Sequence, residues 1–304
     1  MTRPDAPEPP ATITPPACPL PAGAVNAHVH LVGADFALAE RAVERPGPGT
    51  LDDWLARFRR HQAALGCSRA VIVHSILYGG DNDITLEAAR RLGPGHASVC
   101  LITDDATEAQ IAALAAAGAR AVRLNYVHGG LLSWQGMTRL APLLAAHGLH
   151  VEMLAHSHRH LAELAPQVAR LPVRIVFDHF AWPDPALGLT EGQRALEALL
   201  AEGHAWVKLS ACYRFTPDPR DLIARLARAN PERLLWGSDW PHLMLGTAAM
   251  PDAGARLNLL LDAIPDTATR RRLFVDTPAT LYRLEPTKTD QALNHGPAKD
   301  TSAP

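Results

Sequence analysis

Two short segments near opposite ends of the chain carry side chains that could do chemistry together. His28 and His30 follow an apolar run that reads as a buried β-strand, and Asp239 follows a second such run late in the chain. Alternate residues of a strand face the same side, so the two histidines should project together. Polar groups at the mouth of a buried strand cost free energy unless partners or a ligand satisfy them. Two imidazoles and a carboxylate in one site could activate a water molecule or hold a metal ion.

The elements that must bring these groups together follow from hydrophobic periodicity. Short apolar runs rich in branched residues alternate along the chain with segments of helical period. The expected strands are Ala24–His30, Ala70–Ser75, Ala97–Ile102, Ala119–Tyr126, His150–Ala155, Val173–His179, Ala205–Ser210 and Leu234–Asp239. The expected helices are Leu51–Leu65, Ile84–Leu92, Glu108–Ala117, Gly136–His147, His160–Arg170, Glu191–Glu202, Asp221–Ala229 and Ala253–Ile264. A last segment, Arg270–Leu284, reads as an extra closing helix that carries Pro278, a residue that can break a helix.

Eight strand–helix pairs predict an α/β fold, a right-handed (β/α)8 barrel that forms a single domain. The rival architecture, an open doubly wound sheet, would normally carry a GxGxxG turn after its first strand, and the sequence has none. The barrel is expected over residues 23–284. An extended proline-rich arm over residues 1–22 should precede it, and a short disordered tail over residues 285–304 should follow it. Catalytic groups of such barrels lie at the carboxyl ends of the strands.

Composition and charge exclude several classes of partner. A net charge of −2 gives no electrostatic case for binding nucleic acid or an anionic membrane. The N-terminus has no basic-then-apolar signal segment, and no apolar stretch approaches the ~20 residues that cross a bilayer. A cytoplasmic location is therefore expected, with a small molecule as partner.

Signatures of covalent nucleophilic catalysis are missing from the sequence. It has no GxSxG elbow of a serine hydrolase and no cysteine with an evident histidine partner. The four cysteines show no CxxC spacing, and Cys67 and Cys100 are expected to be core residues.

The fourth expected strand adds a cation and an amide to the predicted site. Val122 and Leu124 should face the surrounding helices, so Arg123 and Asn125 should point into the barrel mouth. A guanidinium fixed there suits a substrate carboxylate, and pairing with an acid of the protein itself is the alternative.

The last three strands supply further charged groups. Of the adjacent Asp178 and His179, His179 is expected to face inward because it shares strand parity with the apolar Phe177. Asp239 is expected to point inward by the same parity argument on the eighth strand. Lys208, partway down the seventh strand, could face the interior as a paired charge and is assigned no role.

With paired histidines on the first strand, a histidine on the sixth and an aspartate on the eighth, the chain resembles the amidohydrolase superfamily. Within it, the branch that contains 2-pyrone-4,6-dicarboxylate lactonase and related sugar-lactone hydrolases looks most similar. The stretches that carry the likeness lie between residues 25 and 284: Asn26-Ala27-His28-Val29-His30, Gly80-Asp81-Asn82, Val122-Arg123-Leu124-Asn125, Asp178-His179 with Pro183-Asp184, Lys208-Leu209-Ser210 with Arg214, and Trp236-Gly237-Ser238-Asp239-Trp240-Pro241-His242.

This resemblance implies hydrolysis of a lactone ring, carboxylated or sugar-type, by water. In the family pattern Asp239 would act as general base on that water, with His28, His30 and His179 around the scissile carbonyl oxygen. Donors aimed at the developing oxyanion would lower the barrier by a few kcal/mol each.

Substrate recognition in the family implies roles for two arginines. Arg123 and Arg214 match positions that hold substrate carboxylates, and Asn125 is expected to bind substrate beside them. The pyrone dicarboxylate lactonase has a further arginine where this chain has His128-Gly129-Gly130, and a tyrosine where this chain aligns Leu154. A lactone with one carboxylate or a neutral sugar lactone therefore fits as well as the pyrone dicarboxylate.

A metal ion is the other open question at this stage. Metal-dependent members of the superfamily add a strand-4 lysine or glutamate, or a strand-5 histidine, whereas Arg123 cannot ligate and His156 lies later than the expected ligand. The most similar relatives work without metal, which favours no required cofactor. If one divalent ion such as zinc is bound, its expected ligands are His28, His30, His179 and Asp239, with His156 as a further candidate. The alternative functions are a metal-dependent decarboxylase or amide hydrolase, and a non-catalytic binder of a small acid.

Overall fold

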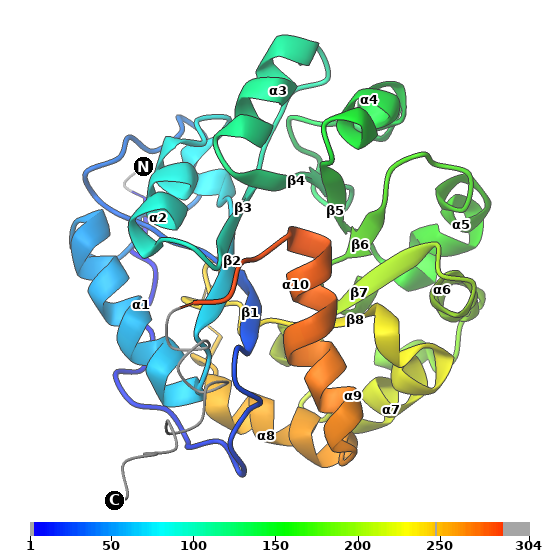
Figure 1. Ribbon diagram of the computed structural model, residues 1–304. Helices are drawn as coiled ribbons and strands as arrows, with labels where there is room; N and C mark the ends of the chain where they lie inside the picture. The colour runs from blue at the N-terminus through cyan, green and yellow to red at the C-terminus, as the bar shows by residue number, and fades with distance from the viewer. Residues whose placement is uncertain (1–2, 247, 288–304) are drawn as a thin grey trace, which may run out of the picture.

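The computed structural model describes residues 3–246 and 248–287 of the chain. Within them, eight parallel strands follow one another around a barrel in chain order (Figure 1). The strands are β1 (Val25–Val29), β2 (Arg69–Val73), β3 (His96–Cys100), β4 (Ala119–Asn125), β5 (His150–Leu154), β6 (Ile175–Phe177), β7 (Ala205–Leu209) and β8 (Leu234–Trp236). The (β/α)8 barrel expected from the sequence is confirmed.

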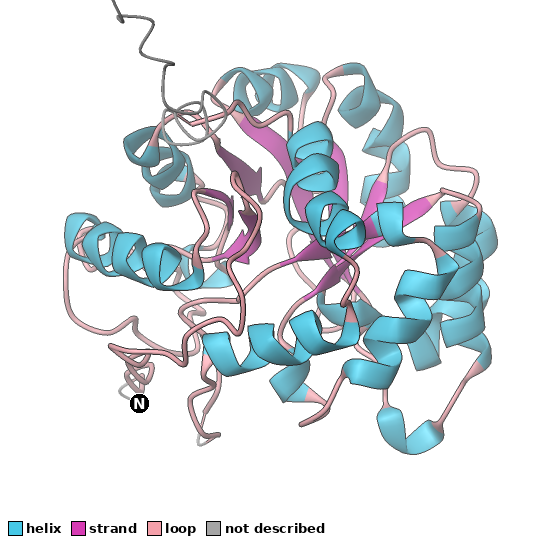
Figure 2. Ribbon diagram, turned by 60° about the horizontal axis from the view of Figure 1, so that its bottom comes forward, coloured by secondary structure: helices cyan, strands magenta, loops and turns pink. Residues whose placement is uncertain are grey.

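Helices surround the barrel on its outer side (Figure 2). They are α1 (Leu51–Leu65), α2 (Asp83–Leu92), α3 (Glu108–Ala116), α4 (Trp134–Ala146), α5 (Ala162–Val168), α6 (Glu191–Ala201), α7 (Arg220–Ala229) and α8 (Ala253–Ala263). The bounds of α1 match the expectation, because Thr50 closes a capping box at its start and Gly66 adopts a left-handed φ of 79° at its end. Shorter turns of 3-10 or π type are η1 (Ile76–Tyr78), η2 (Ser157–Leu161), η3 (His179–Ala181), η4 (Pro185–Leu187), η5 (Cys212–Arg214), η6 (Pro231–Arg233) and η7 (Arg272–Asp276).

The barrel closes where the chain beyond β8 meets β1. The backbone N–H of Asp239 donates to the carbonyl of His28 at 2.9 Å, and the N–H of His30 donates to the carbonyl of Trp240 at 2.8 Å. Gly237 allows the two segments to approach this closely, because a Cβ at that position would lie only 2.6 Å from the backbone nitrogen of His28. The seam between the two strands therefore places Asp239 directly beside the paired histidines.

A bulge in β1 decides which way those histidines point. Asn26 pairs with Ala70 and Val29 pairs with Ile72, so three steps on β1 match two steps on β2. Asn26 points outward, where its amide donates to Gln62 of α1, and Ala27 packs inside the barrel. Beyond the extra residue the alternation is shifted, so Val29 packs outward and the neighbouring histidines face the interior.

Two short helices close the end of the barrel opposite the carboxyl ends of the strands. Segment Arg270–Leu284, expected as one closing helix, divides into α9 (Thr267–Arg271), the π-turn η7 and α10 (Thr277–Tyr282). Pro278 lies in the first turn of α10, where its missing N–H leaves no hydrogen bond unmade. Figure 1 shows α10 lying across the barrel, and Tyr282 packs among the interior residues of the strands.

The segment before β1 runs over the outside of the barrel. Thr14 bonds through its N–H and hydroxyl to Asp252 at the start of α8, and Asp5 pairs with Arg45 at 2.9 Å. The tail expected over residues 285–304 falls outside the described residues from position 288 onward. None of the described helices is long and apolar enough to cross a membrane.

Candidate active site

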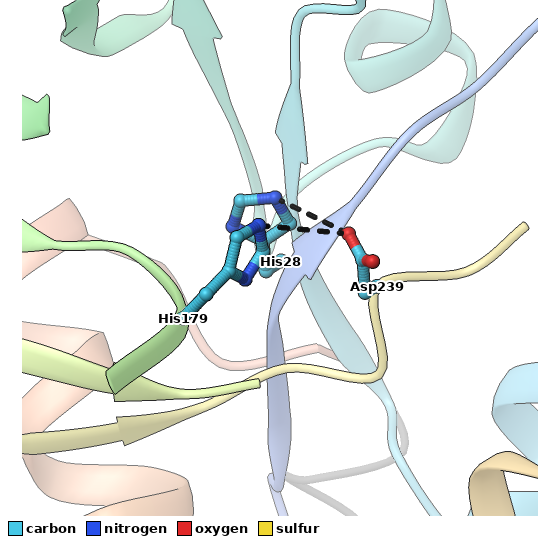
Figure 3. A group of neighbouring side chains, drawn as sticks. All are labelled: His28, His179 and Asp239. Atoms are coloured by element: carbon cyan, nitrogen blue, oxygen red, sulfur yellow. Dashed lines mark ion pairs between the residues drawn. The ribbon is translucent and has the colours of Figure 1, made fainter. Parts of the chain in front are cut away.

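The carboxyl ends of β1, β6 and β8 bring three side chains together (Figure 3). Nε2 of His28 lies 3.7 Å from Oδ1 of Asp239, and Nε2 of His179 lies 4.0 Å from the same oxygen. Nε2 of His30 lies 3.5 Å from it. The four groups expected from the sequence to form the catalytic centre are therefore neighbours, and all are buried.

The two oxygens of Asp239 have different surroundings. Oδ2 accepts hydrogen bonds from the hydroxyl of Tyr213 at 2.5 Å and from the guanidinium of Arg214 at 3.1 Å. Oδ1 faces the three imidazoles at distances too long for direct hydrogen bonds. One oxygen is thus fixed by donors, and the other faces three imidazole nitrogens without a direct hydrogen bond.

Hydrogen bonds at Nδ1 of His30 and His179 bear on which ring nitrogen of each carries the proton. Nδ1 of His30 lies 2.7 Å from the carbonyl oxygen of Val73, which can only accept, so Nδ1 carries the proton. When the ring carries a single proton, its Nε2 presents a lone pair to the site. Nδ1 of His179 lies 2.8 Å from the hydroxyl of Ser210, which can donate or accept and leaves the position of that proton open.

Burial and pairing set the charges at neutral pH. Burial lowers the pKa of His28 to about 4 and holds the pKa of His179 well below its usual range. Burial alone would raise the pKa of Asp239, but Arg214 and the facing imidazoles outweigh it and hold that pKa well below its usual range. The site therefore combines an ionised carboxylate with neutral imidazoles, an arrangement that can accept a proton without an ion-paired histidine.

Strained backbone positions the acid and the third histidine. Asp239 has a φ of 62°, and the run from His179 to Trp182 has four consecutive positive φ values. Such left-handed conformations are uncommon for residues with a side chain and persist where the surrounding structure imposes them. They end β6 and β8 at Phe177 and Trp236, earlier than the sequence predicts.

His179 reaches the site as expected, but the strand-parity argument used to choose it over Asp178 is wrong. Phe177 packs outward against the helices, so alternation directs Asp178, not His179, into the barrel. Asp178 is fully buried and lies 3.3 Å from Nδ1 of His28. His179 reaches the site only because the left-handed turn after β6 redirects it.

Below these groups lies a set of buried charges that the sequence analysis did not assign to the site. Nζ of Lys208 lies 2.5 Å from Glu152, 3.2 Å from Nδ1 of His28 and 3.4 Å from Asp178. The hydroxyl of Tyr282 donates to the other oxygen of Glu152 at 2.6 Å. Lys208 thus faces the interior as a paired charge, as its place on the seventh strand had suggested. The sequence signal for this pair was one acidic and one basic residue, each within an otherwise apolar strand.

The arginines proposed to bind substrate are paired with protein acids. Nε of Arg123 lies 3.4 Å from Asp178, and Arg214 contacts Asp239 and the carbonyl of Leu243. Their side chains are 12% and 16% exposed, whereas the side chain of His28 is fully covered, so both guanidiniums lie nearer the solvent than the histidine. The side-chain amide oxygen of Asn125 accepts from the backbone N–H of His128 and stabilises the turn after β4.

Among the described residues, two groups of neighbouring side chains contain residue types that can bind a metal ion. His28, His179 and Asp239 form one, and Nε2 of His28 in it is a buried atom without a hydrogen-bond partner. By residue type, two imidazoles and a carboxylate are among the ligands that zinc takes. The second group, His28 with Glu152 and Asp178, already surrounds the ammonium of Lys208 and does not fit a further cation.

His156 belongs to neither of these groups. Its Nδ1 lies 3.3 Å from the carbonyl oxygen of Trp182, and its ring packs against those of His158 and His160. The structure thus does not bring it to the carboxylate of Asp239.

Comparison with known proteins agrees with this geometry. A family model described as amidohydrolase matches residues 25–284, and the chain belongs to that family. A 4-sulfomuconolactone hydrolase from Rhizobium radiobacter is 32% identical over 86% of this chain and 91% of that protein.

Two further relatives match over nearly their whole length. A 2-pyrone-4,6-dicarboxylate hydrolase from Comamonas testosteroni is 29% identical over 86% of this chain and 91% of that protein. A D-galactarolactone isomerase from Agrobacterium fabrum is 29% identical over 88% of this chain and 94% of that protein. The likeness inferred from the sequence to lactone-processing amidohydrolases is confirmed.

Proposed function

We propose that this protein hydrolyses a lactone ring, carboxylated or sugar-type, with a water molecule activated by Asp239. Two of the reported relatives are named for hydrolysis of a lactone or pyrone ring, which supports this substrate class. The observation that carries the proposal is the asymmetry of Asp239. Its Oδ2 is held by two donors while its Oδ1 faces three imidazoles without a direct bond.

The attacking water is assigned to a position beside Asp239 and His30, within hydrogen-bond reach of both side chains. Oδ1 of Asp239 and the lone pair on Nε2 of His30 are two acceptors 3.5 Å apart, and one water can donate to both. This leaves a lone pair of the water oxygen free to attack a carbonyl carbon. Asp239 receives the proton as the new C–O bond forms, and its low basicity requires that attack and proton transfer occur together.

The carbonyl oxygen of the lactone is placed against His28 and His179. An N–H directed at this oxygen stabilises the negative charge that develops during attack. Collapse of the tetrahedral intermediate then breaks the ring C–O bond, and the leaving alcohol oxygen takes up the proton that Asp239 received from the water. The product is a hydroxy acid, which contains one more water than the lactone.

Recognition of the substrate is assigned to the two arginines. Nε of Arg123 lies 3.4 Å from Asp178, and its Nη1 donates to the carbonyl of His74. A carboxylate or ring hydroxyl of the substrate can bind its remaining N–H groups. Arg214 is committed to Asp239, so its first role is to orient the base.

A metal-dependent reaction is the second candidate, because the donor set of His28, His179 and Asp239 fits zinc. His30 would complete such a set, and a bound zinc ion would polarise the carbonyl and lower the pKa of bound water. We favour the metal-independent reaction. Measurement of metal content on the purified protein, with activity before and after chelation, separates the two.

A lactone panel assayed in oxygen-18 water tests the proposed reaction. Hydrolysis places one heavy oxygen in the carboxylate of the product, whereas isomerisation of a lactone, as in one relative, incorporates none. The panel should include pyrone carboxylates, muconolactones and sugar lactones. Ring opening without heavy oxygen, or no turnover across the panel with metal-free and zinc-loaded protein, would contradict the proposal.

A further inference from the structure

Lys208 is the one basic side chain on the inner face of β7, and the proposed hydrolysis gives it no direct task. It shares that face with Trp206 and Ser210, while Val207 and Leu209 pack outward. Its side chain is fully buried and its Nζ lies beneath His28, on the side of the imidazole opposite Asp239. Lys208 therefore acts on the site only through another residue.

The contact between Lys208 and Nδ1 of His28 favours one of the two neutral forms of the imidazole. An ammonium has three N–H donors and no acceptor, so at 3.2 Å it requires a lone pair on Nδ1 of His28. Asp178 lies at a similar distance, 3.3 Å, from Nδ1, but its Oδ1 makes no hydrogen bond. With Nδ1 accepting from Lys208, the proton of neutral His28 is on Nε2, which points toward Asp239.

We infer that Lys208 is a positioning residue that holds His28 as its Nε2–H tautomer, and that by doing so it makes His28 a hydrogen-bond donor and a poor metal ligand. The first consequence rests on the proposed function, because the N–H on Nε2 is then directed at the carbonyl oxygen of the lactone. The second is independent of it. Metal binding through Nε2 requires a lone pair there, and the displaced proton on Nδ1 would face an ammonium.

His30 provides a comparison within the same site. Metal-bound histidines usually donate their second ring N–H to a carbonyl or a carboxylate. His30 has this arrangement, because its Nδ1–H donates to Val73. His28 has the reverse arrangement, with a donor behind its ring. The two histidines therefore carry their protons on different nitrogens. His30, protonated on Nδ1, accepts from the water, and His28, protonated on Nε2, donates to the carbonyl oxygen of the lactone.

Glu152 is what keeps the ammonium in this position. It binds Nζ at 2.5 Å and is held in turn by Tyr282 at 2.6 Å, so the lysine is anchored from the floor of the barrel. Replacement of Lys208 alone would leave this carboxylate buried without a cation. The variant Lys208→Met therefore needs the companion Lys208→Met/Glu152→Gln, in which the buried pair is neutral.

The test is a measurement of histidine tautomers by long-range proton–nitrogen NMR on protein labelled with nitrogen-15 at histidine. The signals of His28 are assigned with His28→Gln, and His30 and His74 serve as internal references. Nδ1–H of His30 donates to Val73 and Nε2–H of His74 donates to Gly79, so neither tautomer should depend on Lys208. In the unaltered protein we expect the Nε2–H form of His28, and in the folded lysine variant the Nδ1–H form, with Asp178 as acceptor.

Zinc affinity and kinetics supply two further readouts. Loss of Lys208 should tighten zinc binding roughly 10–100-fold, the range typical for changes in groups behind a metal ligand. On any lactone that the protein hydrolyses, kcat should fall with little change in KM. An Nδ1–H tautomer in the unaltered protein, or an unchanged tautomer and zinc affinity in the folded double variant, overturns the inference. A confirmed tautomer with no lactone turnover would instead count against the proposed function alone.

Discussion

Replacement of Asp239 by asparagine is the sharpest test of water activation. The substitution preserves the shape of the side chain and removes its charge and its basic oxygen. If the amide oxygen takes the place of Oδ2, it accepts the same hydrogen bonds from Tyr213 and Arg214 that now hold the carboxylate. The amide nitrogen then faces the imidazoles and cannot accept a proton from water.

The effects on rate and on stability should differ in size. A positioned general base contributes about 10²–10⁴-fold to a rate, so kcat should fall by a factor in that range. Arg214 keeps its 2.8 Å bond to the carbonyl of Leu243 and loses only the ionic part of its contact with position 239. The free energy of unfolding should therefore fall by about 1–2 kcal/mol, the difference between charged and neutral hydrogen bonds.

The assay combines steady-state kinetics on the preferred lactone with thermal unfolding of the same samples. The matched control is Asp262→Asn on α8, where an exposed carboxylate pairs with Arg220 at 2.8 Å, and it should change neither quantity appreciably. An Asp239→Asn protein that unfolds at the normal temperature and keeps kcat within tenfold of the original would refute the assigned role. The water would then be activated by another group, of which His30 is the nearest.

Three further changes test the surroundings of the site. Arg123→Met should raise KM for a carboxylated lactone by about tenfold or more while kcat changes less, because the change removes a charged hydrogen bond to substrate. An unchanged KM would show that Arg123 binds only its partners within the protein. Gly237→Ala should lower the free energy of unfolding, measured by urea denaturation, by about 1–3 kcal/mol or more. The added methyl group would overlap backbone atoms of His28. Full stability with normal activity would contradict the close contact between Gly237 and His28. Burial lowers the pKa of His61 to about 3 and that of His74 to about 4. The unfolded chain binds protons at these groups below about pH 6.5 and the folded chain does not, so stability should fall as pH drops from 6.5 toward 4, by up to about 3 kcal/mol for each. Urea midpoints measured across this range check the prediction, and a constant midpoint would oppose it.

Hydrophobic periodicity predicted the barrel well because each strand is a short apolar run with helix signals on both sides. The expected and observed bounds of most strands differ by one or two residues. β8 is the exception, since it ends at Trp236, three residues before the expected Asp239, which adopts left-handed backbone. That conformation depends on contacts with other strands and leaves no mark in the local pattern.

Alternation was less reliable as a guide to which way a side chain points. It gave the correct face for Arg123 and Asp239, which share parity with the interior residues Ala121 and Leu235. It failed for Asp178, because Phe177, the apolar residue whose parity predicts an inward-facing His179, packs outward against the helices. At His28 the paired projection was correct, although a bulge in β1 reverses the parity relative to Ala27.

Contacts between distant strands set the limit of what one sequence could show. Glu152 and Lys208 stand alone in apolar strands, and nothing local indicates that they meet each other beneath His28. The pairing of Arg214 with Asp239 likewise depends on where η5 lies over the barrel mouth. Such partners become visible only when the order of strands around the ring is known.

The seam between the first and last strands has a consequence for biogenesis. Asp239 joins His28 only after the ring is complete, so a nascent chain released from the ribosome as far as β7 would hold imidazoles without their acid. Tyr282, which seals the floor under Glu152, is translated later still. Catalytic competence should therefore arise in one late step, and fragments lacking the final quarter of the polypeptide should be inert however well their helices form.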